Sequence, residues 1–335
     1  MDAMHISLGV VITLIVVALL FDFMNGFHDA ANSIATIVST RVLKPQHAVL
    51  WAAGFNFLAY FLFHLKVAAT IGKGTIDPGI VDHYVIFGAL VGAIAWNLIT
   101  WYYGIPSSSS HALVGGLVGA AVSKAGFGSL IASGVLKIIA FIFIAPLLGF
   151  LIGGLLMIAV SWICRGMTQR RVDKYFRRFQ LLSAAAYSLG HGGNDAQKTV
   201  GIIWMILIAA GLSTTESEIP GWVVLACYTA MGLGTMFGGW RIVKTMGNRI
   251  TKLNQARGFC ANSGGAVTLF MASALGIPVS TTHTITGAIA GVGITRGTRR
   301  VRWGVAGNIV WAWILTIPCS ALIASVAWYI GGFLL

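Results

Sequence analysis

The sequence carries little charge for its length. Only 9% of the 335 residues are Asp, Glu, Lys or Arg and only nine are acidic, whereas 57% are hydrophobic. A soluble chain has about a quarter charged residues, so this composition cannot supply the polar surface of a soluble protein. A soluble enzyme and a disordered chain are therefore excluded, and an integral membrane protein is indicated.

Cysteine is also scarce. The four cysteines form no Cys-x-x-Cys pair and lie in or beside apolar stretches, as Cys227 and Cys319 do. Cysteines in such surroundings behave as small apolar side chains. We therefore expect neither a disulfide scaffold nor a cysteine-based metal centre.

Apolar runs dominate the chain. An outer-membrane barrel would alternate polar and apolar residues over strands of about 10 residues. These runs do not alternate, so we expect an all-α polytopic membrane protein. The runs long enough to cross a bilayer, at about 20 residues each, are Ile6–Met24, His47–Ile71, Tyr84–Gly104, Leu130–Cys164, Trp222–Trp240, Ala261–Gly276 and Trp303–Leu335. Shorter runs after polar breaks are Ser33–Val42, Ala112–Val122, Thr199–Leu212 and Thr284–Ile294.

The basic residues predict how the chain is oriented. The net charge is +13, and 17 of the 22 basic residues fall into four connections, at 41–44, 165–178, 241–257 and 296–302. Basic loops remain on the cytoplasmic side of a membrane. We therefore predict that these connections are cytoplasmic, that both termini are external, and that the protein lies in the inner (plasma) membrane. Because the charge is placed in this way, we expect contact with the lipid bilayer and no binding of nucleic acid.

The two halves of the chain repeat each other. Gly104–Gly119 (GIPSSSSHALVGGLVG) and Gly276–Gly291 (GIPVSTTHTITGAIAG) are identical at seven of 16 positions, and Gly26–Ala35 resembles Gly192–Gly201 more weakly. In the predicted orientation the repeats are inverted, which is typical of secondary transporters that bind their substrate near the membrane midplane. We predict a first inverted repeat at 1–164, a basic cytoplasmic linker at 165–179 and a second inverted repeat at 180–335.

Polar breaks within the repeats predict where helices are interrupted. A proline ends the preceding helix and the hydroxyl residues after it begin the next one. We therefore expect paired helical hairpins at 84–122 and about 255–294, re-entrant or fully spanning, with their tips entering from opposite sides. Asn25-Gly26 and Gly190–Gly193 predict one broken helix in each repeat.

The hairpin tips have the chemistry of an anion site. The start of a helix offers free backbone N–H groups and a partial positive charge, and hydroxyl side chains add further donors. One hydroxyl is enough to cap a helix, so three or four in both halves favour an oxyanion site over capping alone. The predicted anion-binding residues are Ser108, Ser109, Ser110, Ser280, Thr281 and Thr282.

Carboxylates inside apolar runs are the second functional signal. An ionised carboxylate costs about 2.5–3.5 kcal/mol at the centre of a membrane helix, yet Asp29 and Asp195 occupy matching places in the two repeats. Asn32 and Asn194 lie beside them and add carbonyl oxygens, which suits a small cation or a proton. We predict that these four residues couple a cation, with capping of broken helices as the structural alternative.

Six more polar residues are predicted to support the site. Lys198 is the only basic residue deep in an apolar run, and we expect it to pair with Asp195 or to hold an anion. His111 and His283 follow the hydroxyl runs at matching positions, and Asp22 lies two turns before Asp29 as a relay or a polar helix contact. The complete supporting set is Asp22, His28, His111, Gln197, Lys198 and His283.

These motifs together resemble the PiT family of inorganic phosphate transporters. The resemblance rests on GFHDAANSIAT (Gly26–Thr36), HGGNDAQKTVG (His191–Gly201), GIPSSSSH in the first half and STTHT (Ser280–Thr284) in the second. It implies symport of inorganic phosphate with a cation by alternating access, in which the Asp/Asn motifs are linked to the cation and the Ser/Thr tips hold phosphate. It implies no cofactor and no enzymatic activity.

The resemblance also bears on the coupling ion. GFHD and NDAQK resemble the bacterial proton-coupled branch, sometimes associated with metal–phosphate complexes, whereas the sodium-coupled branch favours Asn-Asp-Val-Ala-Asn in both halves. Lys198 stands where the first repeat has Asn32, and a fixed positive charge there disfavours a second metal cation. We therefore expect H+ rather than Na+. If the ion is Na+, Asp29 and Asp195 are its expected ligands.

Other functions stay open as alternatives. Sulfate or another tetrahedral oxyanion would suit the same hydroxyls and backbone N–H groups. An intramembrane hydrolase could use Ser110 or Ser280 with His111 or His283, although neighbouring side chains on a helix diverge by about 100° and make a poor nucleophile–base pair. A homodimer fits a transporter of this size, but no residue specifies one.

Overall fold

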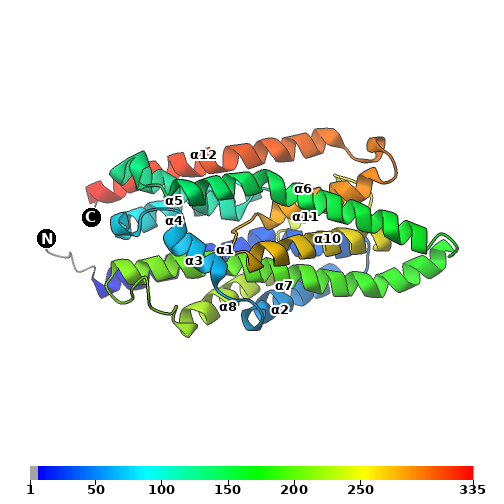
Figure 1. The fold of residues 1–335 in the computed structure, drawn as a ribbon, viewed down its shortest axis with the longest axis horizontal. Coiled ribbons are helices and arrows are strands. Elements are labelled where there is room, and N and C mark those ends of the chain that lie inside the picture. The colour runs from blue at the N-terminus through cyan, green and yellow to red at the C-terminus, as the bar shows by residue number, and fades with distance from the viewer. Residues whose placement is uncertain (1–6, 335) are drawn as a thin grey trace.

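The computed structural model describes residues 7–334, and nearly all of them are helical (Figure 1). The first half contains α1 (Leu8–Ser39), α2 (Pro45–Leu58), α3 (Lys66–Gly74), α4 (His83–Tyr103), α5 (Ser109–Ala125) and α6 (Ala132–Ile163). The second half contains α7 (Gln169–Ala209), α8 (Gly221–Phe237), α9 (Trp240–Asn248), α10 (Gln255–Ala274), α11 (Thr281–Ile294) and α12 (Trp303–Leu334). Short 3-10 turns lie at Ala59–Phe61, Pro78–Ile80, Phe127–Ser129 and Thr298–Arg300. The all-α prediction is confirmed.

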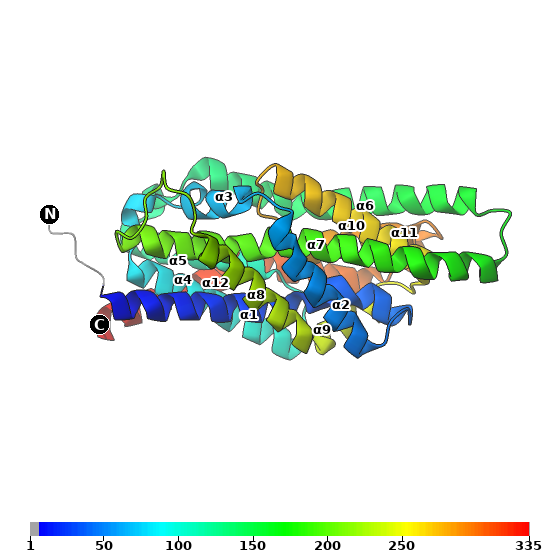
Figure 2. The same cartoon turned by 90° about the horizontal axis from the view of Figure 1, so that it is seen from below.

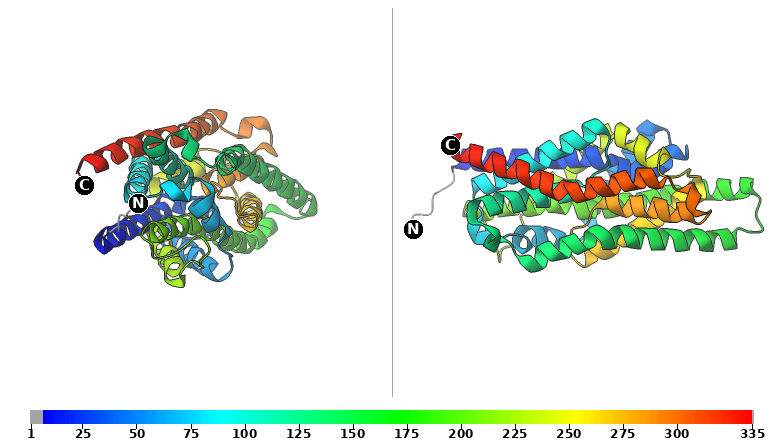
Figure 3. Two further views of the ribbon diagram at one scale, coloured as in Figure 1. Left: turned by 60° about the vertical axis from the view of Figure 1, so that its left-hand side comes forward. Right: turned by 90° about the horizontal axis from the view of Figure 1, so that it is seen from above.

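The two halves use the same order of elements and interlock. Each begins with a long helix, continues with a bent pair and a two-helix hairpin, and ends with a 32-residue helix, α6 or α12, that contains a proline (Pro146 or Pro318). The hairpin helix α5 packs on α12, and α11 packs on α6, so each hairpin is held by the other half. The long helices run along the molecule, and α12 lies on its outside (Figure 3). The predicted inverted-repeat architecture is confirmed.

Glycines let each hairpin approach its long helix closely. A Cβ atom on Gly119 of α5 would lie 2.2 Å from the carbonyl oxygen of Ala321, and one on Gly291 of α11 would lie 2.1 Å from that of Phe150. Each glycine is four residues from another one with a similarly close backbone neighbour. This Gly-x-x-x-Gly spacing brings helix backbones together in membranes, where van der Waals packing drives association.

The hairpins α4–α5 and α10–α11 enter from opposite ends of the molecule (Figure 2). The base of the first is closed by Lys124, whose Nζ donates to Asp82 Oδ2 at 2.7 Å. Each hairpin starts and finishes at one end of the bundle, as both a re-entrant and a fully spanning hairpin would. The first turn of α1 and the last turn of α12 also lie together at one end (Figure 2). Residues 1–6 and 335 lie outside the described part, and the side of the membrane on which the termini lie stays a prediction.

The predicted positions of the broken helices were wrong. α1 and α7 are continuous through Gly26 and Gly190–Gly193. A Cβ on Gly26 would lie 2.2 Å from Met231 O, and one on Gly192 2.4 Å from Asn56 O, so these glycines serve helix contacts. The bends lie instead between α2 and α3, at 80°, and between α8 and α9, at 73°. In the described chain, α1, α4, α6 and α12 are long and apolar enough to cross a membrane, and the two bent pairs bring the candidate spans to as many as six.

The division of the chain into 1–164, 165–179 and 180–335 stays a prediction. Within the predicted linker, residues from Gln169 onward form the first turns of α7, which is 41 residues long. The α6–α7 connection therefore projects beyond the rest of the bundle (Figure 1).

Candidate functional site

Both hairpins turn in the same way. Gly104 and Gly276 follow the first helix of each hairpin with φ of +65° and +67°, a left-handed conformation that glycine adopts without strain. The next amide closes the turn, since Ile105 N donates to Thr100 O at 2.9 Å and Ile277 N to Ala272 O at 2.8 Å. This is the usual glycine ending of a helix, and the proline that follows prevents continuation. We call residues 104–108 the first tip and residues 276–280 the second tip.

One hydroxyl at each tip caps the returning helix. Ser108 Oγ accepts from His111 N at 3.1 Å, and Ser280 Oγ accepts from His283 N at 3.2 Å. The next hydroxyls lie in the first helical turn and have other roles. Capping therefore accounts for two of the six predicted anion-binding residues and leaves four hydroxyls without that explanation: Ser109, Ser110, Thr281 and Thr282.

The long helix of each half reaches the hairpin of the other half. In α1, Asn32 Nδ2 donates to Thr282 Oγ1 at 2.9 Å. In α7, Lys198 Nζ donates to Ser110 Oγ. Asn32 and Lys198 are equivalent in the repeat, as are Thr282 and Ser110, so the same contact is made twice. The two halves thus build one site between them.

The first carboxylate is held by a histidine and a hydroxyl. Asp29 Oδ1 lies 2.7 Å from His28 Nδ1, and the hydroxyl of Thr282 donates to the same oxygen at 3.5 Å. The other ring nitrogen of His28 lies 3.2 Å from Thr100 Oγ1 in the first hairpin. Asp29 therefore touches groups that belong to both hairpins, one directly and one through His28.

The second carboxylate is more fully bound. Asp195 Oδ1 accepts from Lys198 Nζ at 2.5 Å, and Oδ2 accepts from Thr281 Oγ1 at 3.0 Å. His191 Nε2 lies 3.4 Å from Oδ2. One ligand-type atom from each of Asp29, His191 and Asp195 falls within 4.8 Å of the others, so the two carboxylates face each other across the site.

The site is closed and its charge is not balanced. All sixteen predicted site residues are buried, with exposures of at most 3%. If both carboxylates are ionised and Lys198 is protonated, Asp29, Asp195 and Lys198 sum to a net charge of −1. Buried charges of one sign repel strongly because little solvent screens them. A negatively charged substrate can therefore share this site only with added positive charge.

Two predicted residues fix neighbouring backbone. Asn194 Nδ2 donates to Ser273 Oγ at 3.1 Å, and Asn194 Oδ1 accepts from Val279 N at 3.1 Å, so its side chain braces the second tip. Gln197 Oε1 accepts from Val67 N at 3.1 Å and thereby caps α3. Both residues act on the frame of the site and not on its centre.

Three supporting residues lie apart from this hydrogen-bond network. The imidazoles of His111 and His283 pack against one another with ring centroids 4.7 Å apart, and no ring nitrogen of either has a hydrogen-bond partner among the described residues. No Ser–His pair of the hydrolase type is therefore formed within the described chain. Asp22 is fully buried, and neither of its carboxylate oxygens has a partner in the part that the structure describes.

The structure adds residues that the sequence prediction omitted. His191 lies one helical turn before Asp195, and its Nδ1 lies 3.1 Å from Asn56 Oδ1. Its place inside the HGGNDAQK motif was the available signal. Thr36 donates to Asn262 Oδ1 at 2.9 Å, and Tyr187 donates to Thr281 O at 2.8 Å. No spacing in the sequence marks either contact.

Comparison with known proteins agrees with this architecture. The family described as "Phosphate transporter family" matches residues 25–170 and 164–324, one segment in each half. A probable low-affinity inorganic phosphate transporter of Rhizobium meliloti is 59% identical over 98% of this chain and 98% of its own length. One of Bacillus subtilis with the same description is 47% identical over the same shares.

A solved structure has the same fold. The protein described as "The sodium-dependent phosphate transporter" matches with a TM-score of 0.89 and 27% sequence identity, covering 98% of this chain and all of that one. The likeness includes both halves and therefore the hairpins and long helices that build the site.

Proposed function

The chain belongs to the phosphate transporter family, and from that premise we propose that it carries inorganic phosphate across the membrane together with a proton. The family is one of transporters and not of enzymes, and the chain is a multi-pass membrane protein. The observation that carries the proposal is the closed site between the two hairpins, in which hydroxyls and an ammonium group are hydrogen-bonded to two carboxylates.

The donors at the site suit phosphate. Ser110 and Thr282 present hydroxyls from opposite hairpins, and the Lys198 ammonium, which now donates to Ser110, Asp195 and Val279 O, is a charged donor that phosphate could share. Asp29 and Asp195 are acceptors, and a phosphate that keeps a proton can donate to them. Sulfate carries no proton at neutral pH, so the carboxylates would repel it. Phosphate is therefore the favoured oxyanion, and sulfate is the alternative substrate.

The charge of the site favours co-transport with a cation. A site of net charge −1 admits a phosphate anion only if protons or metal ions enter with it. Each carboxylate has a histidine neighbour, His28 at 2.7 Å from Asp29 and His191 at 3.4 Å from Asp195. A carboxylate and an imidazole can each bind a proton, so each Asp–His pair offers a place where a proton can be taken up with the substrate.

Sodium fits these residues less well. Hard cations prefer oxygen ligands, but the three-residue set around the carboxylates includes the imidazole of His191. In addition, the ammonium of Lys198 lies 2.5 Å from Asp195 Oδ1 and already offers this carboxylate a cationic partner, so a second cation gains less there. We therefore favour H+ as the coupling ion, with Na+ as the alternative.

Access would alternate between two surface pockets. One, of about 590 Å³, is lined by the first tip, by α12 and by Thr245 of α9. The other, of about 250 Å³, is lined by residues 62–64, by Lys66 of α3 and by the end of α10, including Ser273, which binds the site residue Asn194. Opening one pocket to the site while the other stays shut would carry phosphate across. In the predicted orientation, the α3 pocket faces outside and the α9 pocket faces the cytoplasm.

Transport in proteoliposomes tests the proposal. The purified protein should take up radiolabelled phosphate under an inward proton gradient in sodium-free buffer, and excess sulfate should compete weakly. Asp29→Asn and Asp195→Asn should remove the response to the proton gradient. Uptake that requires sodium would overturn the choice of ion, and preferential sulfate uptake would overturn the choice of substrate. Transport of neither anion would contradict the function as a whole.

A further inference from the structure

Two short helices hold the hairpin tips from outside the site. α3 follows the 80° bend after α2 and lies over the second tip. Lys66 Nζ donates to the carbonyl oxygen of Ala274 at 3.1 Å, and Thr70 Oγ1 donates to that of Gly276 at 2.7 Å. We call this pair of donors the α3 latch.

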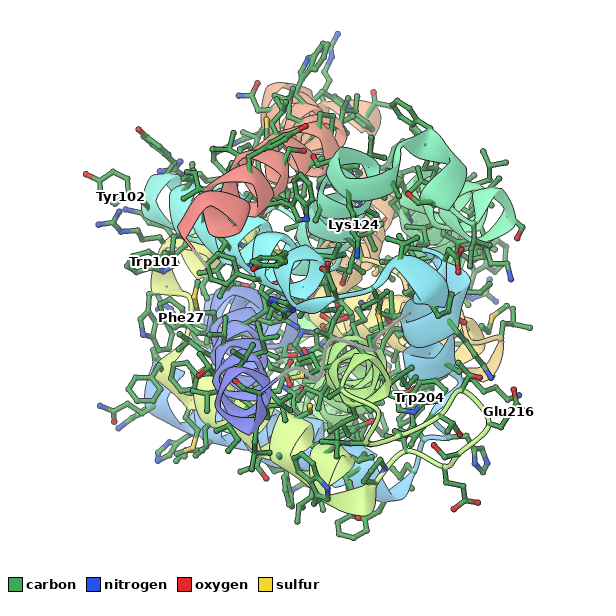
Figure 4. All side chains as sticks on the ribbon, turned by 90° about the vertical axis from the view of Figure 1, so that its left-hand side faces the viewer. Phe27, Trp101, Tyr102, Lys124, Trp204 and Glu216 are labelled. Atoms are coloured by element: carbon green, nitrogen blue, oxygen red, sulfur yellow. The ribbon has the colours of Figure 1, made fainter. Side chains whose placement is uncertain are left out.

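The first tip is held in the same way by α9. Arg241 donates to the carbonyl oxygen of Tyr102, and Thr245 Oγ1 donates to that of Gly104 at 3.2 Å. The Arg241 guanidinium also lies 5.5 Å from the ring centre of Trp101 and 5.2 Å from that of Tyr102, the two aromatic residues labelled at the edge of the bundle in Figure 4. We call Arg241 and Thr245 the α9 latch.

The two latches are one arrangement made twice. Their acceptors are equivalent in the repeat, Tyr102 with Ala274 and Gly104 with Gly276, and in both latches the hydroxyl lies four residues after the basic residue. The acceptors are carbonyls at the end of a helix, which have no partner within it and carry partial negative charge. In each case the latch comes from one half of the chain and the tip from the other.

Each latch helix is seated on a long helix of the site. Gln197, two residues after Asp195, caps α3 by accepting from Val67 N and Ala68 N. At the start of α9, a Cβ on Gly239 would lie 2.9 Å from His28 O, next to Asp29. A change at either carboxylate therefore has a short route to the helix that holds a tip.

The latches also line the two surface pockets. Lys66 borders the pocket beside the second tip, and Thr245 borders the pocket beside the first. They lie toward opposite ends of the bundle, as the positions of α3 and α9 show (Figure 2). Both are engaged in this structure, in which the site is buried.

We propose that the α3 latch and the α9 latch position the second and first tips in their closed states, and that each face opens by release of its own latch while the other holds. The proposal rests on the alternating access proposed above. It assigns positioning roles to Lys66, Thr70, Arg241 and Thr245, none of which touches the substrate site. Loss of one latch should therefore open one face only.

Thiol labelling of the purified protein in detergent tests this. In a variant whose four cysteines are replaced, Val279→Cys reports on the second tip and Ser107→Cys on the first, since both residues are buried and equivalent in the repeat. Lys66→Met with Thr70→Val should raise the labelling rate at 279 by about tenfold, because two ordinary hydrogen bonds are lost. The rate at 107 should stay the same or fall. Arg241→Met with Thr245→Val should give the mirror result.

Matched controls separate a latch from general loosening. Lys73→Met changes another lysine of α3, one that donates to Thr215 O and not to a tip, and should leave both labelling rates unchanged. Lys244→Met serves the same purpose on α9. Lys66→Arg keeps a charged donor and should retain slow labelling at 279. The altered latch side chains are exposed or only half-buried, so the variants should fold.

Two outcomes would contradict the latch proposal. One is an equal rise in the labelling rate at 107 and 279 in either latch variant. The other is an unchanged labelling rate in both latch variants. Labelling requires neither phosphate nor an ion gradient. The protein could fail to transport phosphate while each latch variant still raised the labelling rate at its own tip only. That result would contradict the proposed substrate and leave the latch proposal in place. Normal phosphate uptake with unchanged labelling rates in the latch variants would support the proposed substrate and contradict the latch proposal.

Discussion

Lys198→Asn tests the charge arrangement at the centre of the site, because it places in the second half the residue that the first half carries at Asn32. Lys198 Nζ donates to Asp195 at 2.5 Å, to Val279 O at 2.7 Å and to Ser110, so the substitution leaves three buried acceptors short of a donor. Breaking a buried ion pair by removing one partner costs about 3–5 kcal/mol. An asparagine amide recovers part of this by donating to one acceptor.

The expected result has a stability part and a transport part. The melting temperature, followed by tryptophan fluorescence in detergent, should fall by about 5–15 °C. Adding Asp195→Asn should restore most of it, since replacing both partners of a buried pair is far less costly. The apparent KM for phosphate should rise by about 10–100-fold if the ammonium donates to the anion, which is the range expected for one charge-assisted hydrogen bond.

The same variant examines the coupling ion. Without Lys198, the carboxylates bring the site to a net charge of −2, and Na+ should then raise the melting temperature of Lys198→Asn relative to choline, by mass action on the folded state. The parent protein should respond little. Lys73→Asn, at a solvent-exposed lysine of α3, is the matched control and should behave like the parent. Equal stabilisation of parent and variant by Na+, or an unchanged KM in Lys198→Asn, would refute the role given to this ammonium.

Three other changes have expected outcomes. Thr282→Val removes a hydroxyl that bridges Asn32 and Asp29 and should raise the phosphate KM severalfold in uptake assays while folding is retained. Gly119→Ala should lower the melting temperature by the equivalent of about 1–3 kcal/mol, because its Cβ would lie 2.2 Å from a backbone oxygen, whereas Gly54→Ala, with open space around it, should not. Asp22→Leu removes a buried carboxyl without a described partner, so it should raise thermal stability and lower proton-driven uptake.

The hairpins could be predicted because their sequence signals are local. Gly-Ile-Pro followed by hydroxyls encodes a helix end, a break and a helix start within a few residues, and the structure has these features at Gly104–Ser108 and Gly276–Ser280. The duplication and the placement of the basic connections together predicted the inverted arrangement, because the expected orientation put the two copies of the motif on opposite sides. It also paired Asp29 with Asp195, and these residues do meet at one site.

The broken helices were misplaced because glycine has two uses that look alike in a sequence. Gly26 and Gly192 predicted interruptions, but each instead lets a second helix backbone come close. The bends that do occur, after Phe61 and after Phe237, lie where the apolar run contains no proline. The latch contacts were equally hidden, because Lys66 and Ala274 are more than 200 residues apart and resemble ordinary membrane-edge residues.

The two halves of this chain match in geometry and differ in chemistry, and transport needs both properties. Alternating access requires that the two faces close with similar stability, and the paired latches provide similar contacts at Gly104 and Gly276. If the site itself were equally symmetric, position 198 would carry an asparagine as position 32 does. No positively charged side chain would then lie beside the carboxylates. The exchange of asparagine for lysine at this position places one ammonium group next to Asp195. The frame can therefore rock between equivalent states while the site keeps the charge asymmetry that the proposed symport of phosphate with a cation uses.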